Sequence, residues 1–227
     1  MLEKQREKRE MIVLEGVTKR YHENVYALRD ISFQISKGEC CFILGPSGAG
    51  KTTLLKILYG LETPTNGHAS LYDRNIRKIG RSGLQSLRRH VGFVFQDYQL
   101  IDNWTVYDNA AVILEILGKS SGYIKNRVWQ MLRWVGLQHK VYERAGDLSG
   151  GEKQLLAIIR ATIHDPDILL ADEPVGSLDE ATANHVMSMF FKLHKKGITM
   201  LIASHREDPL IDFARTINLD RGMTVAR

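Results

Sequence analysis

Residues 39–59 read ECCFILGPSGAGKTTLLKILY, a short apolar run followed by a glycine-rich stretch and then by apolar residues at helical spacing. The run before Gly45 is typical of a buried parallel strand, and the pattern after Lys51 predicts a helix that ends near Gly60. Glycines suit the turn between the two, because the backbone there must wrap closely around a bound group and direct its N–H groups toward it. Strand, glycine-rich loop and helix in this order predict a phosphate-binding loop.

The loop has an expected role for each of its polar groups. Residues 45–52 match the pattern GxxxxGK[ST], in which backbone amides and the helix N-terminus hold the phosphates of a nucleotide. We expect Lys51 to reach the β- and γ-phosphates and the Thr52 hydroxyl to bind Mg²⁺. The expected nucleotide-binding residues of this segment are Gly45, Pro46, Ser47, Gly48, Ala49, Gly50, Lys51, Thr52 and Thr53.

Further short apolar runs predict a parallel sheet. Residues 91–95, 167–171 and 198–203 read VGFVF, DILLA and ITMLIA, and a helical pattern separates the last two, which is a βαβ arrangement. Between residues 97 and 157 the apolar spacing is mainly helical. One stripe in that region contains Ile124, Val128, Met131, Leu132 and Val135. The sequence therefore predicts an α/β fold into which a helical lobe is inserted.

The composition excludes several classes of protein. Of the 227 residues, 44% are hydrophobic and 25% are charged, which excludes a disordered chain, a fibrous protein and a disulfide scaffold. No stretch approaches the ~20 apolar residues that a membrane-spanning helix needs. The first ten residues, MLEKQREKRE, contain no apolar segment of the kind found in signal peptides. We expect a charged tail over residues 1–10, a single domain over residues 11–227 and a location in the cytoplasm.

Basic residues are concentrated in the middle of the chain. Residues 74–144 contain twelve lysines and arginines against five acidic residues, although the whole chain carries a net charge of only +5. This asymmetry indicates an anionic partner, either a membrane surface or nucleic acid; a solvated face without a partner is the alternative. The basic residues at the start of this segment are Arg74, Arg77, Lys78, Arg81, Arg88 and Arg89.

Two adjacent carboxylates follow one of the predicted strands. Residues 168–173 read ILLADE, so the strand ends at Asp172 and Glu173. Side chains of neighbouring residues in a strand point in opposite directions, and the two carboxylates are therefore expected to diverge. We expect Asp172 to bind Mg²⁺ and Glu173 to act as the general base for a water that attacks the γ-phosphate.

A third motif distinguishes among phosphate-loop proteins. Residues 148–152 read LSGGE and precede an apolar helical run, which places a second anion site at a helix N-terminus. This segment resembles the signature of the ABC ATPase family. Single residues elsewhere agree with the family pattern in the correct order. They are Tyr21 for the adenine-stacking aromatic, Gln96 for the Q-loop glutamine, Ser177 to Asp179 for the D-loop and His205 for the switch histidine.

The resemblance implies both a fold and an assembly. The fold would be a P-loop NTPase core with a parallel sheet, an antiparallel β lobe and a helical lobe over approximately residues 97–157. The cofactors would be ATP and Mg²⁺, with Thr52, Gln96 and Asp172 as metal ligands. The catalytic residues would be Glu173, His205 and Gln96. In the ATP-bound state the chain would form a homodimer, in which the partner's nucleotide is contacted by Ser149, Gly150, Gly151, Glu152 and Asp179.

The sequence departs from the family pattern at three positions. Leu155 stands where the signature helix usually has arginine, and residues 172–179 read DEPVGSLD where DEPTGNLD is common, so Val175 and Ser177 differ. None of these changes removes an expected catalytic group. Glu173 and His205 are both present, and we expect an active ATPase rather than a protein that only binds nucleotide.

Within the family, three segments most resemble the bacterial cell-division ATPases of the FtsE type. They are residues 26–33 (YALRDISF), 95–98 (FQDY) and 105–110 (TVYDNA). This resemblance implies an FtsX-like integral membrane protein as partner, control of cell-wall hydrolysis during division, and a peripheral location on the cytoplasmic face of the inner membrane.

Two other functions are known for ABC ATPases with similar motifs. The alternative within membrane complexes is an ATPase of a lipoprotein-releasing or small-molecule exporter, whose motifs overlap with those of the division ATPases. ABC ATPases that act on nucleic acid carry long coiled-coil or zinc-hook inserts. This chain has neither sustained heptads nor a cysteine pair suited to zinc, and we expect no nucleic-acid partner.

Overall fold

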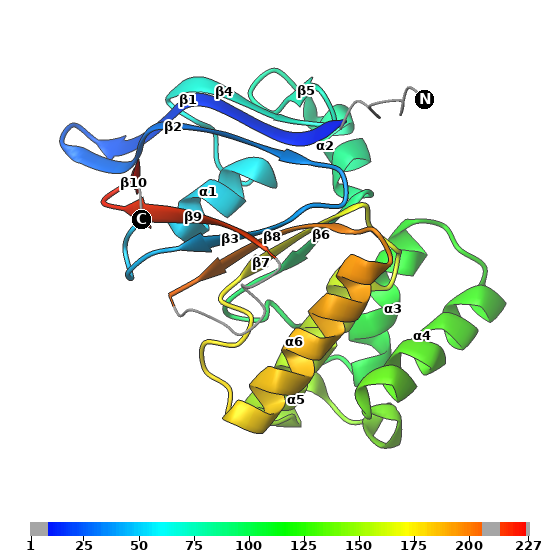
Figure 1. The fold of residues 1–227 in the computed structure, drawn as a ribbon. Helices are drawn as coiled ribbons and strands as arrows, with labels where there is room; N and C mark the ends of the chain where they lie inside the picture. Colours follow the sequence, from blue (N-terminus) through cyan, green and yellow to red (C-terminus); the bar gives the residue numbers. More distant parts are fainter. Residues whose placement is uncertain (1–8, 206–213, 226–227) are drawn as a thin grey trace, which may run out of the picture.

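The computed structural model describes residues 9–205 and 214–225, and these residues form two sheets with helices between and beside them (Figure 1). The larger sheet has six strands. Five of them are parallel, and the strand at one edge, β10, is antiparallel to its neighbour. In spatial order the sheet contains β10 (Met223–Val225), β9 (Arg215–Asp220), β3 (Cys40–Leu44), β8 (Thr199–Ser204), β7 (Ile168–Asp172) and β6 (Val91–Val94).

The smaller sheet has four antiparallel strands. In spatial order these are β2 (Val25–Ser36), β1 (Glu10–His22), β4 (Asn66–Leu71) and β5 (Arg74–Asn75). Helix α1 (Lys51–Leu58) lies between the two sheets and contacts strands of both (Figure 1). The parallel core and the antiparallel lobe that the sequence predicted are therefore both present.

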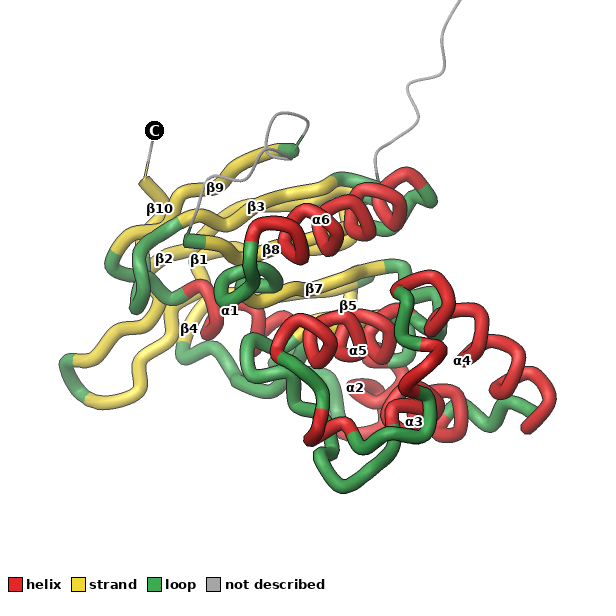
Figure 2. Tube along the Cα trace, turned by 90° about the horizontal axis from the view of Figure 1, so that it is seen from below, coloured by secondary structure: helices red, strands yellow, loops and turns green. Residues whose placement is uncertain are grey.

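Of the remaining helices, the first along the chain packs on the same side of the larger sheet as α1, and the other four lie on the opposite side. In chain order these helices are α2 (Arg81–Arg88), α3 (Val106–Ile116), α4 (Ser121–Val135), α5 (Gly150–Thr162) and α6 (Glu180–Lys195), with short 3₁₀ turns η1 (Gln138–Lys140) and η2 (Ala145–Asp147). Helices α3, α4 and α5 pack on one another, with α4 outermost (Figure 2). The predicted apolar stripe of α4 is buried along its whole length. None of the helices that the structure describes is both long and apolar enough to cross a bilayer.

Strand β3 shows how the core is divided. Cys41 and Ile43 pack with α1 and the antiparallel sheet, whereas Cys40 and Phe42 pack with residues of α5 and α6. Because helices or strands cover both faces of the sheet, β3 is apolar throughout and does not alternate with polar residues. The two cysteines are free thiols, and burial raises the pKa of each to about 12.

Polar residues mark the starts of the four longer helices. Thr105, Ser120, Ser149 and Asp179 are the N-caps of α3, α4, α5 and α6, and each side chain accepts a hydrogen bond from the backbone N–H three residues further on. Helix α1 differs, because its N-cap is Gly50 and no side chain caps it. The N–H groups of its first turn therefore remain open to another acceptor.

The fold begins slightly earlier than the sequence suggested. Strand β1 starts at Glu10, and the carbonyl of Arg9 accepts a hydrogen bond from the Lys37 N–H at 2.9 Å. Glu10 therefore belongs to the antiparallel sheet, and Arg9 is hydrogen-bonded to the turn that follows β2. The other residues of the expected tail, 1–8, lie outside the described residues.

One of the basic residues at the start of the segment 74–144 is not free to face an anionic partner. The Arg88 guanidinium donates to the carbonyls of Tyr59 and Gly60, both at 3.1 Å, and lies 4.9 Å from the centre of the Tyr59 ring. Its charge is therefore used to hold the end of α1 against α2. The exposed basic residues of this segment are Arg74, Arg77, Lys78, Arg81 and Arg89.

Candidate functional site

The glycine-rich loop joins β3 to α1. At two of its positions the backbone is packed so closely that only glycine fits. A Cβ atom on Gly45 would lie 2.1 Å from the carbonyl oxygen of Leu219 in β9. Gly50 has a φ of 104°, and a Cβ atom there would lie 2.3 Å from the carbonyl oxygen of Ala27. Because the backbone packs this closely, the loop can curve around a small anion in front of the uncapped N-terminus of α1.

The amino group of Lys51 is held inside this loop. Lys51 is 4% exposed, and its Nζ donates to the carbonyls of Gly45 at 2.7 Å and Pro46 at 3.1 Å. Nζ also lies 3.3 Å from Oε1 of Glu173, with which it forms an ion pair. A buried ammonium beside open helix N–H groups makes this end of α1 strongly attractive to phosphate.

Asp172 ends strand β7 beside the first turn of α1. Its side chain is buried, and a hydrogen bond joins it to the Thr52 side chain. Burial raises the pKa of Asp172 above its usual value, whereas the bond to Thr52 acts in the opposite direction. The Oδ1 atom is buried and has no hydrogen-bond partner among the described residues.

A hydroxyl and a carboxylate with one unused oxygen form a donor set that Mg²⁺ prefers, so these residues fit the metal that the family resemblance implies. When bound, Mg²⁺ neutralises the charge that develops on the phosphates. The unused Oδ1 of Asp172 supports the fit, because this buried carboxylate oxygen is free to bind a metal ion.

Glu173 directly follows the end of β7, and its backbone is strained. Its φ is 47°, in the left-handed region, and its N–H donates to the carbonyl of Ala203 at 2.9 Å. A non-glycine residue in this region costs of order 1–3 kcal/mol. The turn directs the Glu173 carboxylate toward two groups: Lys51, which contacts Oε1, and Nδ1 of His205, which contacts Oε2.

These groups surround a pocket of about 180 Å³. Its lining includes Ser47 to Thr53, Gln96 and Glu173, together with Ala27 of β2. Tyr21 of β1 lies at the edge, where its hydroxyl is 3.5 Å from Oγ1 of Thr53 and its ring is 46% exposed. The structure thus brings together the residues that the sequence analysis assigned to one nucleotide and its metal.

Two residues of this region were missed by the sequence analysis. Ala27 lines the pocket, and Nζ of Lys19 lies 5.0 Å from the centre of the Tyr21 ring. Lys19 also forms an ion pair with Glu62 at 2.7 Å. The alternation of β1 could have indicated Lys19, because residues two apart in a strand lie on the same face.

The signature residues do not line this pocket. Ser149 and Glu152 form a capping box at the start of α5, and Glu152 forms an ion pair with Lys140 at 2.8 Å. Asp179 accepts hydrogen bonds from Thr182 at 2.7 and 3.0 Å. A Cβ atom on Gly151 would lie 3.1 Å from the Thr182 side chain, so the start of α5 lies next to the start of α6. Ser149, Gly150, Gly151, Glu152 and Asp179 therefore form a separate surface, outside the pocket that holds Lys51.

The phosphate loop, the buried lysine and the carboxylate at the end of the neighbouring strand define a P-loop nucleotide-binding protein. Comparison with known proteins identifies its family. The model of the ABC transporter family matches residues 28–176, and the chain belongs to this family. It is an ATPase of the ABC type.

Among curated proteins, the chain is similar to the cell division ATP-binding proteins FtsE. It is 39% identical to FtsE of Streptococcus pneumoniae over 95% of this chain and 94% of the relative. The FtsE of Mycobacterium tuberculosis is 42% identical over 86% of this chain and 85% of the relative. For FtsE of Escherichia coli the identity is 40%, over 86% and 88%. The resemblance to the FtsE type is therefore confirmed.

Solved structures agree with the assignment of the fold. An ATP-binding cassette solved as a dimer in a post-hydrolysis state, bound to ADP and Pi, matches with a TM-score of 0.85 and 32% identity, over 93% of this chain and 95% of that chain. A component of an ABC transporter complex of Clostridium perfringens matches with a TM-score of 0.84 and 28% identity, over 96% and 88%. The ABC ATPase fold that the sequence predicted is confirmed.

Proposed function

We propose that this ABC ATPase is the ATP-hydrolysing subunit of a membrane complex that acts in bacterial cell division. The observation that carries the proposal is the similarity to FtsE, which extends over nearly the full length of both chains for the Streptococcus pneumoniae relative. A shared ATPase fold alone would not distinguish division from export, because many ABC proteins have it.

In the proposed mechanism, ATP binds with its phosphates at the N-terminus of α1 and with its adenine against the exposed ring of Tyr21. Lys51 leaves the loop carbonyls and pairs with the β- and γ-phosphates. Thr52, Asp172 and Gln96 would hold Mg²⁺, and the unused Oδ1 of Asp172 is available for this.

Glu173 accepts the proton of the attacking water in this mechanism. Its carboxylate lines the same pocket as Thr52 and Gln96, and it is therefore in place beside the proposed metal site. The contact with His205 holds Oε2, and this leaves Oε1, the oxygen nearer Lys51, to face the water. Because proton transfer requires hydrogen-bond reach in a fixed direction, His205 acts by orienting the base.

Two copies of the chain complete each ATP site in this proposal. The surface formed by Ser149, Gly150, Gly151, Glu152 and Asp179 lies outside the chain's own phosphate pocket, yet it presents a helix N-terminus suited to an anion. A second copy can bring this surface onto the γ-phosphate. The dimeric state of the similar cassette bound to ADP and Pi supports this arrangement.

The proposed partner is an FtsX-like integral membrane protein, which would hold the ATPase at the cytoplasmic face of the inner membrane. Closure of the dimer around two Mg-ATP would change the shape of this partner and thereby control cell-wall hydrolysis. The alternative is an ATPase subunit of a lipoprotein-releasing or small-molecule exporter.

A pull-down from native membranes distinguishes these functions. The Glu173→Gln protein with Mg-ATP should remain in the closed state on its partner, and mass spectrometry should identify an FtsX-like membrane protein. The same protein without nucleotide is the control and should recover less of it. Recovery of a lipoprotein-releasing permease would assign the chain to export. Recovery of no membrane protein would contradict both functions.

We also expect the exposed basic residues of β5 and α2 to bind an anionic membrane surface. The charge reversals Arg77→Glu, Lys78→Glu and Arg81→Glu together should lower binding to phosphatidylglycerol vesicles at least ~tenfold, because each basic residue near such a surface contributes about 1 kcal/mol. Co-sedimentation with vesicles measures this binding.

The matched control reverses three exposed lysines of α6 and its end, Lys192, Lys195 and Lys196, which carry the same total charge. These changes should leave vesicle binding nearly unchanged if the membrane faces β5 and α2. Equal binding of the wild-type protein to phosphatidylglycerol and to neutral phosphatidylcholine vesicles would contradict the prediction.

A further inference from the structure

The loop that follows β6 contains two consecutive strained residues. Tyr98 has a φ of 61° and Gln99 a φ of 53°, both in the left-handed region. For residues other than glycine this conformation costs roughly 1–2 kcal/mol each. The Tyr98 N–H donates to the carbonyl of Phe95 at 3.2 Å and closes a turn around Gln96 and Asp97. The direction of Gln96, which lines the ATP pocket, therefore depends on this turn.

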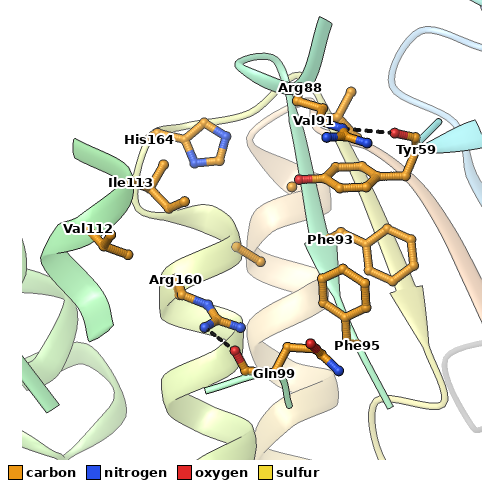
Figure 3. Close-up of a pocket in the computed structure, with 12 residues that line it drawn as sticks. Tyr59, Arg88, Val91, Phe93, Phe95, Gln99, Val112, Ile113, Arg160 and His164 are labelled. Carbon is orange, nitrogen blue, oxygen red and sulfur yellow. Dashed lines mark hydrogen bonds between the residues drawn. The ribbon is translucent and has the colours of Figure 1, made fainter. Parts of the chain in front are cut away.

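Arg160, in the last turn of α5, holds the strained pair from the other side. One guanidinium nitrogen donates to the carbonyl of Gln99 at 2.5 Å (Figure 3). The other donates to the carbonyl of Tyr98 at 2.6 Å. Among the described residues, no carboxylate forms an ion pair with Arg160. The two carbonyls are therefore the main hydrogen-bond acceptors of its guanidinium. The guanidinium fork matches two neighbouring acceptors, which a lysine cannot do.

Aromatic side chains lie on one side of Arg160. It lines a pocket of about 280 Å³ together with Tyr59, Phe93 and Phe95 (Figure 3). The rings of Phe93 and Phe95 stack with their centres 4.1 Å apart, and Tyr59 meets Phe93 edge-on at 5.1 Å. Hydrogen bonds to a charged donor are stronger in such partly buried surroundings than in water.

The side chain of Tyr98 connects the turn to two other segments of the protein. Its hydroxyl lies 3.5 Å from Oγ of Ser177, and a Cβ atom on Gly150 would lie 3.5 Å from the same hydroxyl. Tyr98 therefore touches both the segment after Glu173 and the first residue of α5. Ser149 and Arg160 are at opposite ends of this helix, about 16 Å apart at 1.5 Å per residue.

We propose that Arg160 is a positioning residue for ATP hydrolysis, which locks the strained Tyr98–Gln99 turn so that Gln96 faces the ATP pocket and Tyr98 faces Ser177. Arg160 acts through Gln96 and does not touch the nucleotide. The inference rests on the proposed role of Gln96 as a ligand of Mg²⁺. A shift of α5 at its signature end would reach Gln96 through this contact.

The test is steady-state ATP hydrolysis by the full chain, with separate titrations of ATP and Mg²⁺. The Arg160→Lys variant keeps the charge but donates from a single point. We expect its kcat to fall about tenfold or more and its half-saturating Mg²⁺ concentration to rise severalfold, since small misplacements of catalytic groups can lower rates by up to ~100-fold. The KM for ATP should stay within about twofold. The control Arg133→Lys, on the exposed face of α4, should change none of these values.

A second pair of variants tests the strain itself without altering Arg160. Gln99 is exposed, so substitutions there open no cavity in the core. Gln99→Val places a β-branched residue in the left-handed region and should reproduce the effect of Arg160→Lys on kcat and on Mg²⁺. Gln99→Gly adopts this conformation readily and should behave like the wild-type protein. This pair decides the question even if Arg160→Lys fails to fold.

Three results separate the inference from the proposed function on which it rests. Normal kcat and Mg²⁺ dependence in folded Arg160→Lys, or equal behaviour of Gln99→Val and Gln99→Gly, would overturn the inference. If Gln96→Ala alone shows the defect in Mg²⁺ dependence, the proposed metal ligand stands and the positioning role of Arg160 fails. If Gln96→Ala is normal, the proposed ligand itself is wrong, and the route from Arg160 through Gln96 fails with it.

Discussion

Glu173→Gln is expected to lower the turnover number for ATP about a thousandfold while ATP still binds. A general base contributes ~10²–10⁴ to a rate, and the amide cannot accept the proton of the attacking water. Glutamine has the shape of glutamate, so it can keep the contacts with Lys51 and His205 and adopt the same turn. The loss should therefore fall on kcat, with little change in the affinity for nucleotide.

Release of inorganic phosphate measures the rate, and equilibrium binding of a fluorescent ATP analogue measures the affinity. The matched control is Glu15→Gln on the exposed side of β1, which should retain wild-type turnover. Turnover of Glu173→Gln within about threefold of wild type would remove Glu173 from the role of base. Another carboxylate or a water held by phosphate would then have to take the proton.

Lys51→Ala should weaken ATP binding itself by about a hundredfold. Hydrogen bonds to charged groups contribute ~1.5–3 kcal/mol, and 2.7 kcal/mol corresponds to a hundredfold change in a dissociation constant. The Lys51 ammonium is buried and lies against the carbonyls of the loop. The substitution also leaves the Glu173 carboxylate without its nearest cation, which adds repulsion toward the phosphates.

Isothermal titration with ATP and Mg²⁺ measures this loss directly. The increase in melting temperature on addition of ATP provides a second readout, because a ligand that binds only the folded state stabilises it by RT ln(1 + L/Kd), where L is the concentration of free ligand. Lys37→Ala, an exposed lysine in the turn between β2 and β3, should bind ATP like the wild-type protein. A dissociation constant for Lys51→Ala within about threefold of wild type would contradict the proposed role.

The central strand, the loop and the carboxylates could be predicted because their signals are local. An apolar run that does not alternate indicates a strand covered on both faces, and β3 and β7 are buried at every position. The glycines of the loop can be recognised from a short stretch of sequence, and so can the adjacent Asp172 and Glu173.

The position of Glu173 required the folded structure. Its left-handed backbone is tied to the carbonyl of Ala203 in the neighbouring strand β8, a contact that no pattern within residues 168–173 contains. This conformation determines which groups the carboxylate reaches. The sequence could indicate which residue type carries the chemistry, but the direction of its side chain depends on a hydrogen bond from another strand.

Two arginines show the same limit most clearly. Arg88 and Arg160 each lie on an amphipathic helix. A charged residue on such a helix usually lies on the solvated face. In the folded chain Arg88 binds carbonyls 28 and 29 residues away, and Arg160 binds carbonyls 61 and 62 residues away. Spacing along one helix records which side a residue occupies but not which backbone groups are packed against that side. Tertiary packing supplies these acceptors, and it therefore determines whether an arginine faces solvent or holds a loop of the ATP site.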